Sequence, residues 1–137
     1  GDKVIIQPPV YYPFMMAVRE GGRTLVENPL VVVDGRYEMD LADLERKAKD
    51  PANTMLVLCS PHNPVGRVWK KEELCAIADL CTKHNVLVVS DEIHADLTYQ
   101  PYQHISFSTA NQNAKKCSIT YIWFNFIIFF LRKLDKK

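Results

Sequence analysis

The sequence lacks an excess of charge of either sign. Its 17 Lys and Arg residues nearly balance its 16 Asp and Glu residues, which leaves a formal net charge of +1. Proteins that bind nucleic acid or an anionic membrane surface need a concentrated basic face. We therefore expect no nucleic-acid partner.

The sequence also lacks the cysteine spacing of a metal or redox site. It has four cysteines but no C-x-x-C pair, and its four histidines show no ligand spacing with them. One cysteine falls in a predicted strand and two on a predicted helix, so we expect reduced, partly buried thiols. This pattern indicates a reducing compartment, and we expect a cytoplasmic protein without a metal site.

A membrane-spanning run is a third absence. Residues 119–131 form an apolar run of thirteen residues in which only Thr120 and Asn125 are polar. A helix that spans a bilayer needs about 20 residues, so a membrane anchor is not favoured. The chain begins Gly1-Asp2-Lys3, without an initiator Met or a signal peptide. We interpret it as the interior of a longer protein.

What the sequence does contain is a succession of strand and helix patterns. Thr54–Cys59 and Val86–Ser90 are apolar runs typical of strands covered on both faces, and residues 70–84 between them carry apolar residues at helical spacing. The predicted strands are Val4–Gln7, Arg23–Glu27, Thr54–Cys59 and Val86–Ser90, and the predicted helices are 13–20, 40–49 and 70–84. We expect one α/β domain with a mostly parallel sheet and flanking helices.

Local signals mark some element ends. Asp40 is a suitable N-cap for the second helix, and Asp34-Gly35 marks a turn. Residues 94–117 are polar, and we interpret them as loop.

Polar residues follow the two central strands. Cys59 leads into a Pro- and Asn-rich loop that ends at Arg67, and Val86–Ser90 leads into Asp91. In open α/β sheets, ligands bind at the carboxyl ends of the strands. The sequence therefore predicts a ligand site that includes Asn63 and Asp91.

Three segments resemble a known family. Ser60–Gly66 resembles the S-x-x-N-P-[TS]-G loop of fold-type-I pyridoxal 5′-phosphate (PLP) enzymes, and Ser90–His94 resembles their D-E-[IV]-Y strand end. Pro9–Tyr11 resembles the segment that supplies an aromatic ring to the cofactor. The resemblance covers about residues 3–119 and is strongest to the cystathionine β-lyase-like, maltose-regulon-modulator-like branch of the class I/II aminotransferases.

The resemblance implies a role for each matched residue. PLP is an electron sink whose ring nitrogen must stay protonated, and Asp91 matches the carboxylate that holds this proton. Asn63 matches the amide that binds the phenolic oxygen, and Tyr11 matches the ring that stacks on the cofactor, or Tyr12 if the register shifts by one. His94 points into the site or is structural, and Arg67 is interpreted as a solvated surface charge.

Each residue alone allows another interpretation. Asp91 could cap a following helix, Asn63 could be an ordinary turn residue, and Tyr11 could be a half-buried loop aromatic. Their occurrence together, in the order of the family, favours the cofactor site.

The chain also departs from the family pattern. The phosphate-binding loop would precede Gly1, and the region in which the family's Schiff-base lysine is expected reads Tyr121-Ile122-Trp123-Phe124-Asn125-Phe126. We therefore assign no catalytic residue. We expect residues 1–118 to be part of a PLP-binding large domain and residues 119–137 to be a non-homologous apolar and basic tail.

Function follows from the resemblance as a set of hypotheses. The first is a fragment of a PLP-dependent C–S β-lyase that acts on sulfur amino acids, inactive alone, with weak or absent PLP binding. An aminotransferase is the second and a non-catalytic regulatory or interaction protein is the third. The parent enzyme is expected to be a homodimer with an amino-acid substrate.

Overall fold

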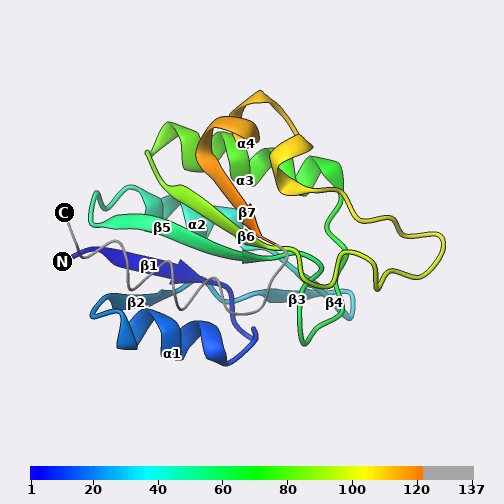
Figure 1. Ribbon diagram of the computed structural model, residues 1–137, viewed down its shortest axis with the longest axis horizontal. Coiled ribbons are helices and arrows are strands. Elements are labelled where there is room, and N and C mark those ends of the chain that lie inside the picture. Colours follow the sequence, from blue (N-terminus) through cyan, green and yellow to red (C-terminus); the bar gives the residue numbers. More distant parts are fainter. Residues whose placement is uncertain (122–137) are drawn as a thin grey trace.

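A five-stranded sheet, parallel throughout, forms the centre of the molecule (Figure 1). The computed structural model describes residues 1–121. The strands are β1 (Lys3–Ile6), β2 (Thr24–Glu27), β5 (Asn53–Cys59), β6 (Leu87–Asp91) and β7 (Ser118–Tyr121), and their order in the sheet is β2-β1-β5-β6-β7. The predicted α/β class with a parallel sheet is confirmed, and the predicted strands differ from these by a residue or so at each end.

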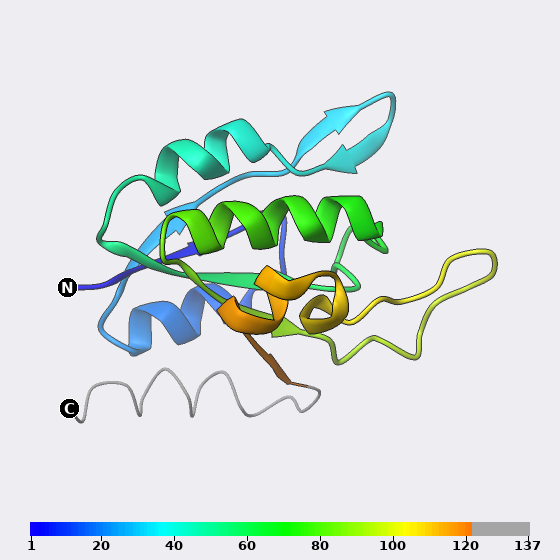
Figure 2. The ribbon, with the colours of Figure 1, turned by 90° about the horizontal axis from the view of Figure 1, so that it is seen from above.

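Helices cover both faces of this sheet. They are α1 (Pro13–Glu20), α2 (Leu41–Ala48), α3 (Lys71–Lys83) and α4 (Gln112–Cys117). Figure 2 shows α2 and α3 on one side of the sheet and α1 on the other. The predicted helix 13–20 is confirmed in full, and those at 40–49 and 70–84 are each one residue too long at both ends.

Alternation along β5 divides the core into two parts. Leu56 and Leu58 belong to the cluster on the face of α2 and α3, whereas Met55, Val57 and Cys59 belong to the cluster on the face of α1. All five side chains are buried. Successive side chains of a strand point to opposite faces, so a strand covered on both faces needs the continuous apolar run seen in the sequence.

A small hairpin was not predicted. β3 (Val31–Val33) and β4 (Arg36–Glu38) pair antiparallel around Asp34 and Gly35, which have φ values of 48° and 74°. Positive φ at both central residues suits a two-residue hairpin turn, so the predicted turn is confirmed. Each strand has only three residues, which is too few to establish a strand period, so the turn alone was predicted.

The loop predicted for residues 94–117 is wrong in its second half. This part contains a 3₁₀ turn at Phe107–Thr109 and α4. The side chain of Asn111 caps α4 by accepting a hydrogen bond from the Ala114 N–H at 2.8 Å. Six residues are too few to show a helical period, which explains why the polar composition suggested a loop.

The first residues of the tail predicted at 119–137 belong to the sheet. Residues 119–121 belong to β7, which pairs with β6, and the rest of the tail lies outside the described residues. Its predicted lack of homology stays a prediction. Among residues 1–121, no helix has both the length and the apolar character needed to cross a membrane.

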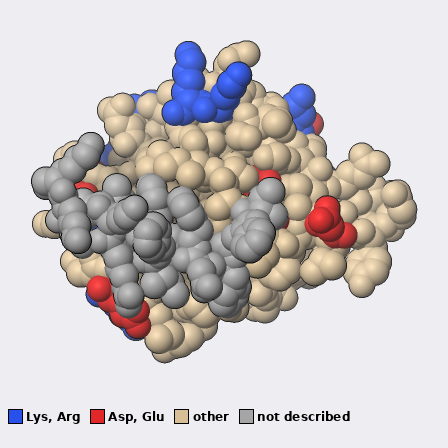
Figure 3. All heavy atoms as spheres, in the orientation of Figure 1, with Lys and Arg blue, Asp and Glu red and all other residues tan. Residues whose placement is uncertain are grey.

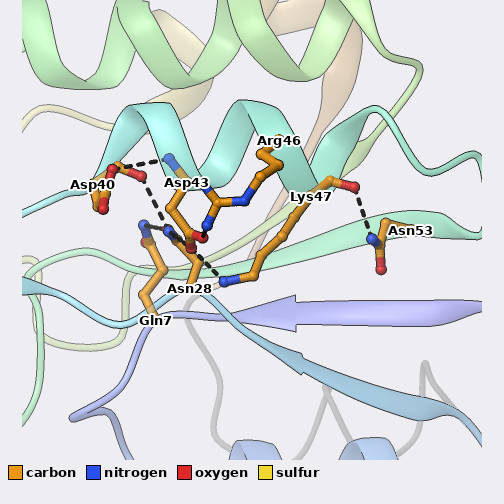
Figure 4. A network of polar contacts seen from close by, with 7 residues as sticks. All are labelled: Gln7, Asn28, Asp40, Asp43, Arg46, Lys47 and Asn53. Atoms are coloured by element: carbon orange, nitrogen blue, oxygen red, sulfur yellow. Dashed lines mark hydrogen bonds and ion pairs between the residues drawn. The ribbon is translucent and has the colours of Figure 1, made fainter.

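A buried polar network joins the β1–β2 edge to α2 (Figure 4). The Asn28 Nδ2 group donates to the Asp43 carboxylate at 2.7 Å and to the Asp40 carbonyl at 3.0 Å, and Asn28 Oδ1 accepts from Gln7 at 3.1 Å. The Asp40 side chain accepts from the Asp43 N–H at 2.9 Å, which confirms the predicted N-cap. Two basic side chains of α2 complete this Asn28 network by pairing with Asp43: Arg46 and Lys47.

The Asp43 carboxylate is well compensated within this network. Burial raises its pKa, but the hydrogen bonds from Lys47 and Asn28 and the charges of Lys47 and Arg46 outweigh burial. The pKa of Asp43 therefore lies below its ordinary value of 3.8. The ionised form is the form that the fold stabilises.

Candidate functional site

A cavity of about 230 Å³ lies past the carboxyl ends of β1, β5 and β6. These three strands are neighbours in the sheet, and the carboxyl edge is where ligands bind in open α/β sheets. The cavity is lined by Tyr11, Cys59, Asn63, Asp91, Ile93 and His94. All four residues that the sequence nominated for cofactor binding therefore lie at one cavity, which we call the Asp91 cavity.

Tyr11 reaches the cavity from the loop between β1 and α1. Its ring packs edge-on against Phe14, with centroids 5.7 Å apart and an interplanar angle of 83°. Tyr12 is 62% exposed and does not line the cavity. The structure therefore favours Tyr11 over Tyr12 as the ring that faces a ligand. Pro13 starts α1 directly afterwards, which fixes where this loop ends.

Asn63 lies in a tight loop after β5. His62 and Arg67 close the loop as an isolated bridge, with the His62 N–H donating to the Arg67 carbonyl at 2.8 Å. Gly66 donates back to the His62 carbonyl at 2.8 Å and has a φ of 70°, a backbone conformation that favours glycine. The Asn63 N–H donates to Cys59 Sγ at 3.3 Å. Asn63 is thus both a turn residue and part of the cavity wall.

Asp91 ends β6 and is 8% exposed. Burial raises its pKa above the ordinary 3.8, although the Ile93 N–H, the Tyr121 hydroxyl and the charge of His94 act in the opposite direction. The Ile93 N–H donates to Asp91 Oδ1 at 3.1 Å, and the segment after Asp91 forms turns rather than a helix. The helix-cap interpretation of Asp91 is therefore wrong.

Cys59 is the register partner of Asp91 on β5. Burial, together with the negative charge of Asp91, raises the pKa of the Cys59 thiol to about 12, against the hydrogen bond from the Asn63 backbone. The thiol is therefore protonated at neutral pH and is not a nucleophile. Among the residues described as lining the cavity, none is a lysine or an arginine, and the charge of His94 does not outweigh the effect of burial on Asp91.

Glu92 follows Asp91 but points to the opposite face of the sheet, as the period of a strand requires. Its Oε1 accepts from the Phe107 N–H at 2.8 Å, from Ser90 at 3.0 Å and from Ser106 at 3.3 Å. Its Oε2 lies 2.9 Å from His104 Nε2. Burial opposes ionisation, but these hydrogen bonds together lower the pKa of Glu92. We call this arrangement the Glu92 clasp. Sequence analysis missed it, although two adjacent carboxylates at a strand end were its signal.

Arg67 is buried, and its interpretation as a surface charge is wrong. It is 9% exposed, its guanidinium lies 4.7 Å from the centre of the Trp69 ring, and it pairs with Glu73 at 2.7 Å. It also donates to the Tyr37 carbonyl. Arg67 therefore joins the Asn63 loop to α3 and to the β3–β4 hairpin. The guanidinium stacks on Trp69 and is paired, which makes its burial tolerable.

The Asp91 cavity offers a definite set of chemical groups. An aromatic ring, an amide and a buried carboxylate face a common space. The raised pKa of Asp91 indicates that its ionised form lacks a full counter-charge. A flat ring with a protonated nitrogen would supply that charge, and a phenolic oxygen on the same ring would suit the Asn63 amide. The residues present therefore fit the pyridine ring of PLP.

Comparison with known proteins points in the same direction. The family model for class I and II aminotransferases matches residues 1–121. The chain is 46% identical over 120 residues to cystathionine β-lyase PatB of Bacillus subtilis, covering 88% of this chain and 31% of that protein. It is 37% identical over 117 residues to kynurenine–oxoglutarate transaminase 3 of Mus musculus, covering 80% of this chain and 26% of that protein.

A solved structure is similar too. The fold matches the crystal structure of cystalysin from Treponema denticola, which contains a PLP cofactor, with a TM-score of 0.84 and 47% identity. The match covers 88% of this chain and 30% of that chain. The chain thus spans about a third of the length of the relatives that it matches.

Proposed function

The chain belongs to the class I and II aminotransferase family of PLP-dependent enzymes, and we propose that it forms the ring-binding part of the PLP site of a C–S β-lyase. The membership confirms the resemblance that the three sequence motifs indicated. The observation that carries the proposal is the convergence of Tyr11, Asn63, Asp91 and His94 on one cavity. They come from the ends of three neighbouring strands.

Each side chain would contact a different part of the flat cofactor. The Asp91 carboxylate accepts the hydrogen bond of the ring nitrogen and keeps that nitrogen protonated. The Asn63 amide donates to the phenolic oxygen, and the Tyr11 ring stacks on the pyridine face. His94 lies at the cavity wall beside them. When bound, PLP supplies an electron sink for a carbanion on the amino-acid substrate.

The lyase activity is proposed over transamination because a protein named cystathionine β-lyase is 46% identical, against 37% for the transaminase. The substrate class would then be sulfur amino acids. Transamination remains the second candidate, since the transaminase is similar over 117 residues of this chain. Assay of the longer parent protein for thiol and pyruvate release, against keto-acid-dependent transamination, separates the two.

A covalent link to the cofactor requires a lysine at the site. The residues described as lining the Asp91 cavity include none. We therefore propose that the 137-residue polypeptide binds the ring reversibly and does not catalyse the reaction. The homodimer expected for the parent protein stays a prediction.

A ligand without an aldehyde tests the ring site directly. Pyridoxine 5′-phosphate carries the same ring nitrogen and phenolic oxygen as PLP but cannot react with surface lysines. Its binding to the 137-residue polypeptide is measured by equilibrium dialysis. Asp91→Asn should weaken binding at least about tenfold, because it removes a charge-assisted hydrogen bond.

Asp96→Asn is the matched control, because Asp96 is exposed and lies in the loop after the cavity. It should bind pyridoxine 5′-phosphate like the wild type. Equal binding by the Asp91 and Asp96 variants, or no binding by the wild type, would contradict the proposed site.

A further inference from the structure

His62 connects the two loops that carry Tyr11 and Asn63. Its Nε2 lies 3.0 Å from the carbonyl oxygen of Pro9, which is 53 positions away in the sequence. Pro9 precedes Tyr11 by two residues, and His62 precedes Asn63 by one. This side-chain contact therefore joins the loop after β1 to the loop after β5, and each of these loops carries a residue of the cavity wall.

The His62 ring has little freedom to move. It is 2% exposed and packs edge-on against Trp69, with ring centroids 5.5 Å apart. Trp69 is itself held, because its indole N–H donates to the Cys59 carbonyl at 2.9 Å and the Arg67 guanidinium lies over its ring. The imidazole is thus fixed in orientation by packing as well as by its hydrogen bond.

The protonation state of the ring follows from its partners. A carbonyl oxygen only accepts, so Nε2 carries the proton that is donated to Pro9. Nδ1 is buried, and no group in the part of the chain that the structure describes donates to it with hydrogen-bond geometry. Burial lowers the pKa of His62, and the charge of Arg67 adds to this effect. The carbonyls of Pro9 and Cys59 raise the pKa but do not outweigh burial. The neutral tautomer with the proton on Nε2 satisfies these conditions.

We propose that His62 is a positioning residue that sets the separation of Tyr11 and Asn63 across the Asp91 cavity. The inference rests on the proposed function for the identity of the ligand, but the contact itself does not. His62 is not among the described residues that line the cavity. It acts through Pro9 on the stacking ring and through its own backbone on the amide.

Two substitutions separate the hydrogen bond from the packing. His62→Phe keeps a ring against Trp69 but removes the donor, whereas His62→Gln places an amide N–H near the former position of Nε2. We expect the dissociation constant of pyridoxine 5′-phosphate to rise about tenfold in the Phe variant and less than about twofold in the Gln variant. His84→Phe, at the opposite end of β6, is the control and should bind like the wild type.

A readout without ligand keeps the inference independent of the proposed function. Backbone NMR shifts of Tyr11 and Asn63 should change together in His62→Phe and stay close to the wild type in His62→Gln. The imidazole ¹⁵N spectrum at pH 7 should show a protonated Nε2 and an unprotonated Nδ1. If the wild type fails to bind the ligand but these shifts behave as stated, the proposed function is wrong and the positioning role stands.

Two results would overturn the positioning role. One is a proton on Nδ1 instead of Nε2. The other is a folded His62→Phe variant whose Tyr11 and Asn63 shifts match those of the wild type, because the hydrogen bond would then position neither residue.

Discussion

The Asn28 network and the Asp91 cavity place similar groups at the same edge of one sheet, yet their electrostatics are opposite. In each, a buried carboxylate lies near a side-chain amide: Asp43 with Asn28, and Asp91 with Asn63. Asp43 is surrounded by donors from its own chain, and its pKa is lowered. Asp91 faces a hollow space, and its pKa is raised.

The difference distinguishes a structural cluster from a binding site. Polar groups that saturate one another stabilise the fold and leave nothing to offer a ligand. A buried carboxylate whose ionised form is incompletely compensated destabilises the fold slightly, and such carboxylates are concentrated at functional sites. Surface charge is no guide here, since on the face seen in Figure 3 the described residues form no broad basic area.

The largest expected effect comes from breaking the Asn28 network. Asn28→Ala leaves the buried Gln7 amide without its partner and removes one of the two donors to Asp43 Oδ2, of which Lys47 is the other. The free energy of unfolding should therefore fall by about 2–4 kcal/mol. Urea unfolding followed by tryptophan fluorescence measures it. Asn113→Ala removes a solvent-exposed bond to Asp79 and should change stability by about 0.5 kcal/mol or less. Equal losses in the two variants would refute the structural role of the network.

The second expected effect is that substitutions of the two carboxylates change the free energy of unfolding in opposite directions. At pH 7, Asp43→Asn should lower the free energy of unfolding by about 1–3 kcal/mol, and Asp91→Asn should raise it by about 1 kcal/mol. The native pKa of Asp43 is depressed, so its contribution is present above the unfolded value of 3.8 and is lost as pH falls through the native pKa. The native pKa of Asp91 is raised, so its ionisation costs stability as pH rises from 3.8 through the native pKa.

Both differences from the wild type should therefore vanish at low pH, where each carboxylate is protonated. Urea midpoints of the three proteins between pH 2.5 and pH 7, a range set by the two shifts, test this. Two variants that change stability in the same direction at pH 7 would remove the contrast between the regions.

The smallest effect concerns the thiol in the cavity wall. With a pKa of about 12, Cys59 is almost fully protonated at neutral pH, so iodoacetamide should leave it unmodified in the native protein. The same reagent should label it after denaturation, as mass spectrometry of tryptic peptides will show. Rapid native labelling of Cys59 would mean that the cavity is more polar and more open than its geometry indicates.

The sequence was sufficient to predict the site residues that lie at or just after the ends of strands. Asp91 and Asn63 follow apolar runs whose length and β-branched character predict buried parallel strands, and such strands bring their carboxyl ends to one edge. The choice between Tyr11 and Tyr12 depends on the folded structure, because adjacent residues of a loop have no periodicity that distinguishes them.

Contacts between distant side chains could not be predicted in the same way. His62, Glu92 and Arg67 each have at least one partner between 6 and 53 positions away, and nothing in the local pattern identifies that partner. Arg67 misled the prediction because an isolated arginine is usually exposed. Only the placement of Trp69 and Glu73 around it explains its burial.

The Glu92 clasp also bears on how this region can be altered. The Glu92 carboxylate holds together the two ends of the segment from Ile93 to Ser106. The hydrogen bonds that offset the entropy cost of closing this loop therefore do not involve the Asp91 side chain. The exposed tip, which includes Leu97, Tyr99 and Tyr102, can then change in length or sequence while the neighbouring cavity wall stays in place. The clasp thus makes this loop a natural site for inserting or exchanging sequence.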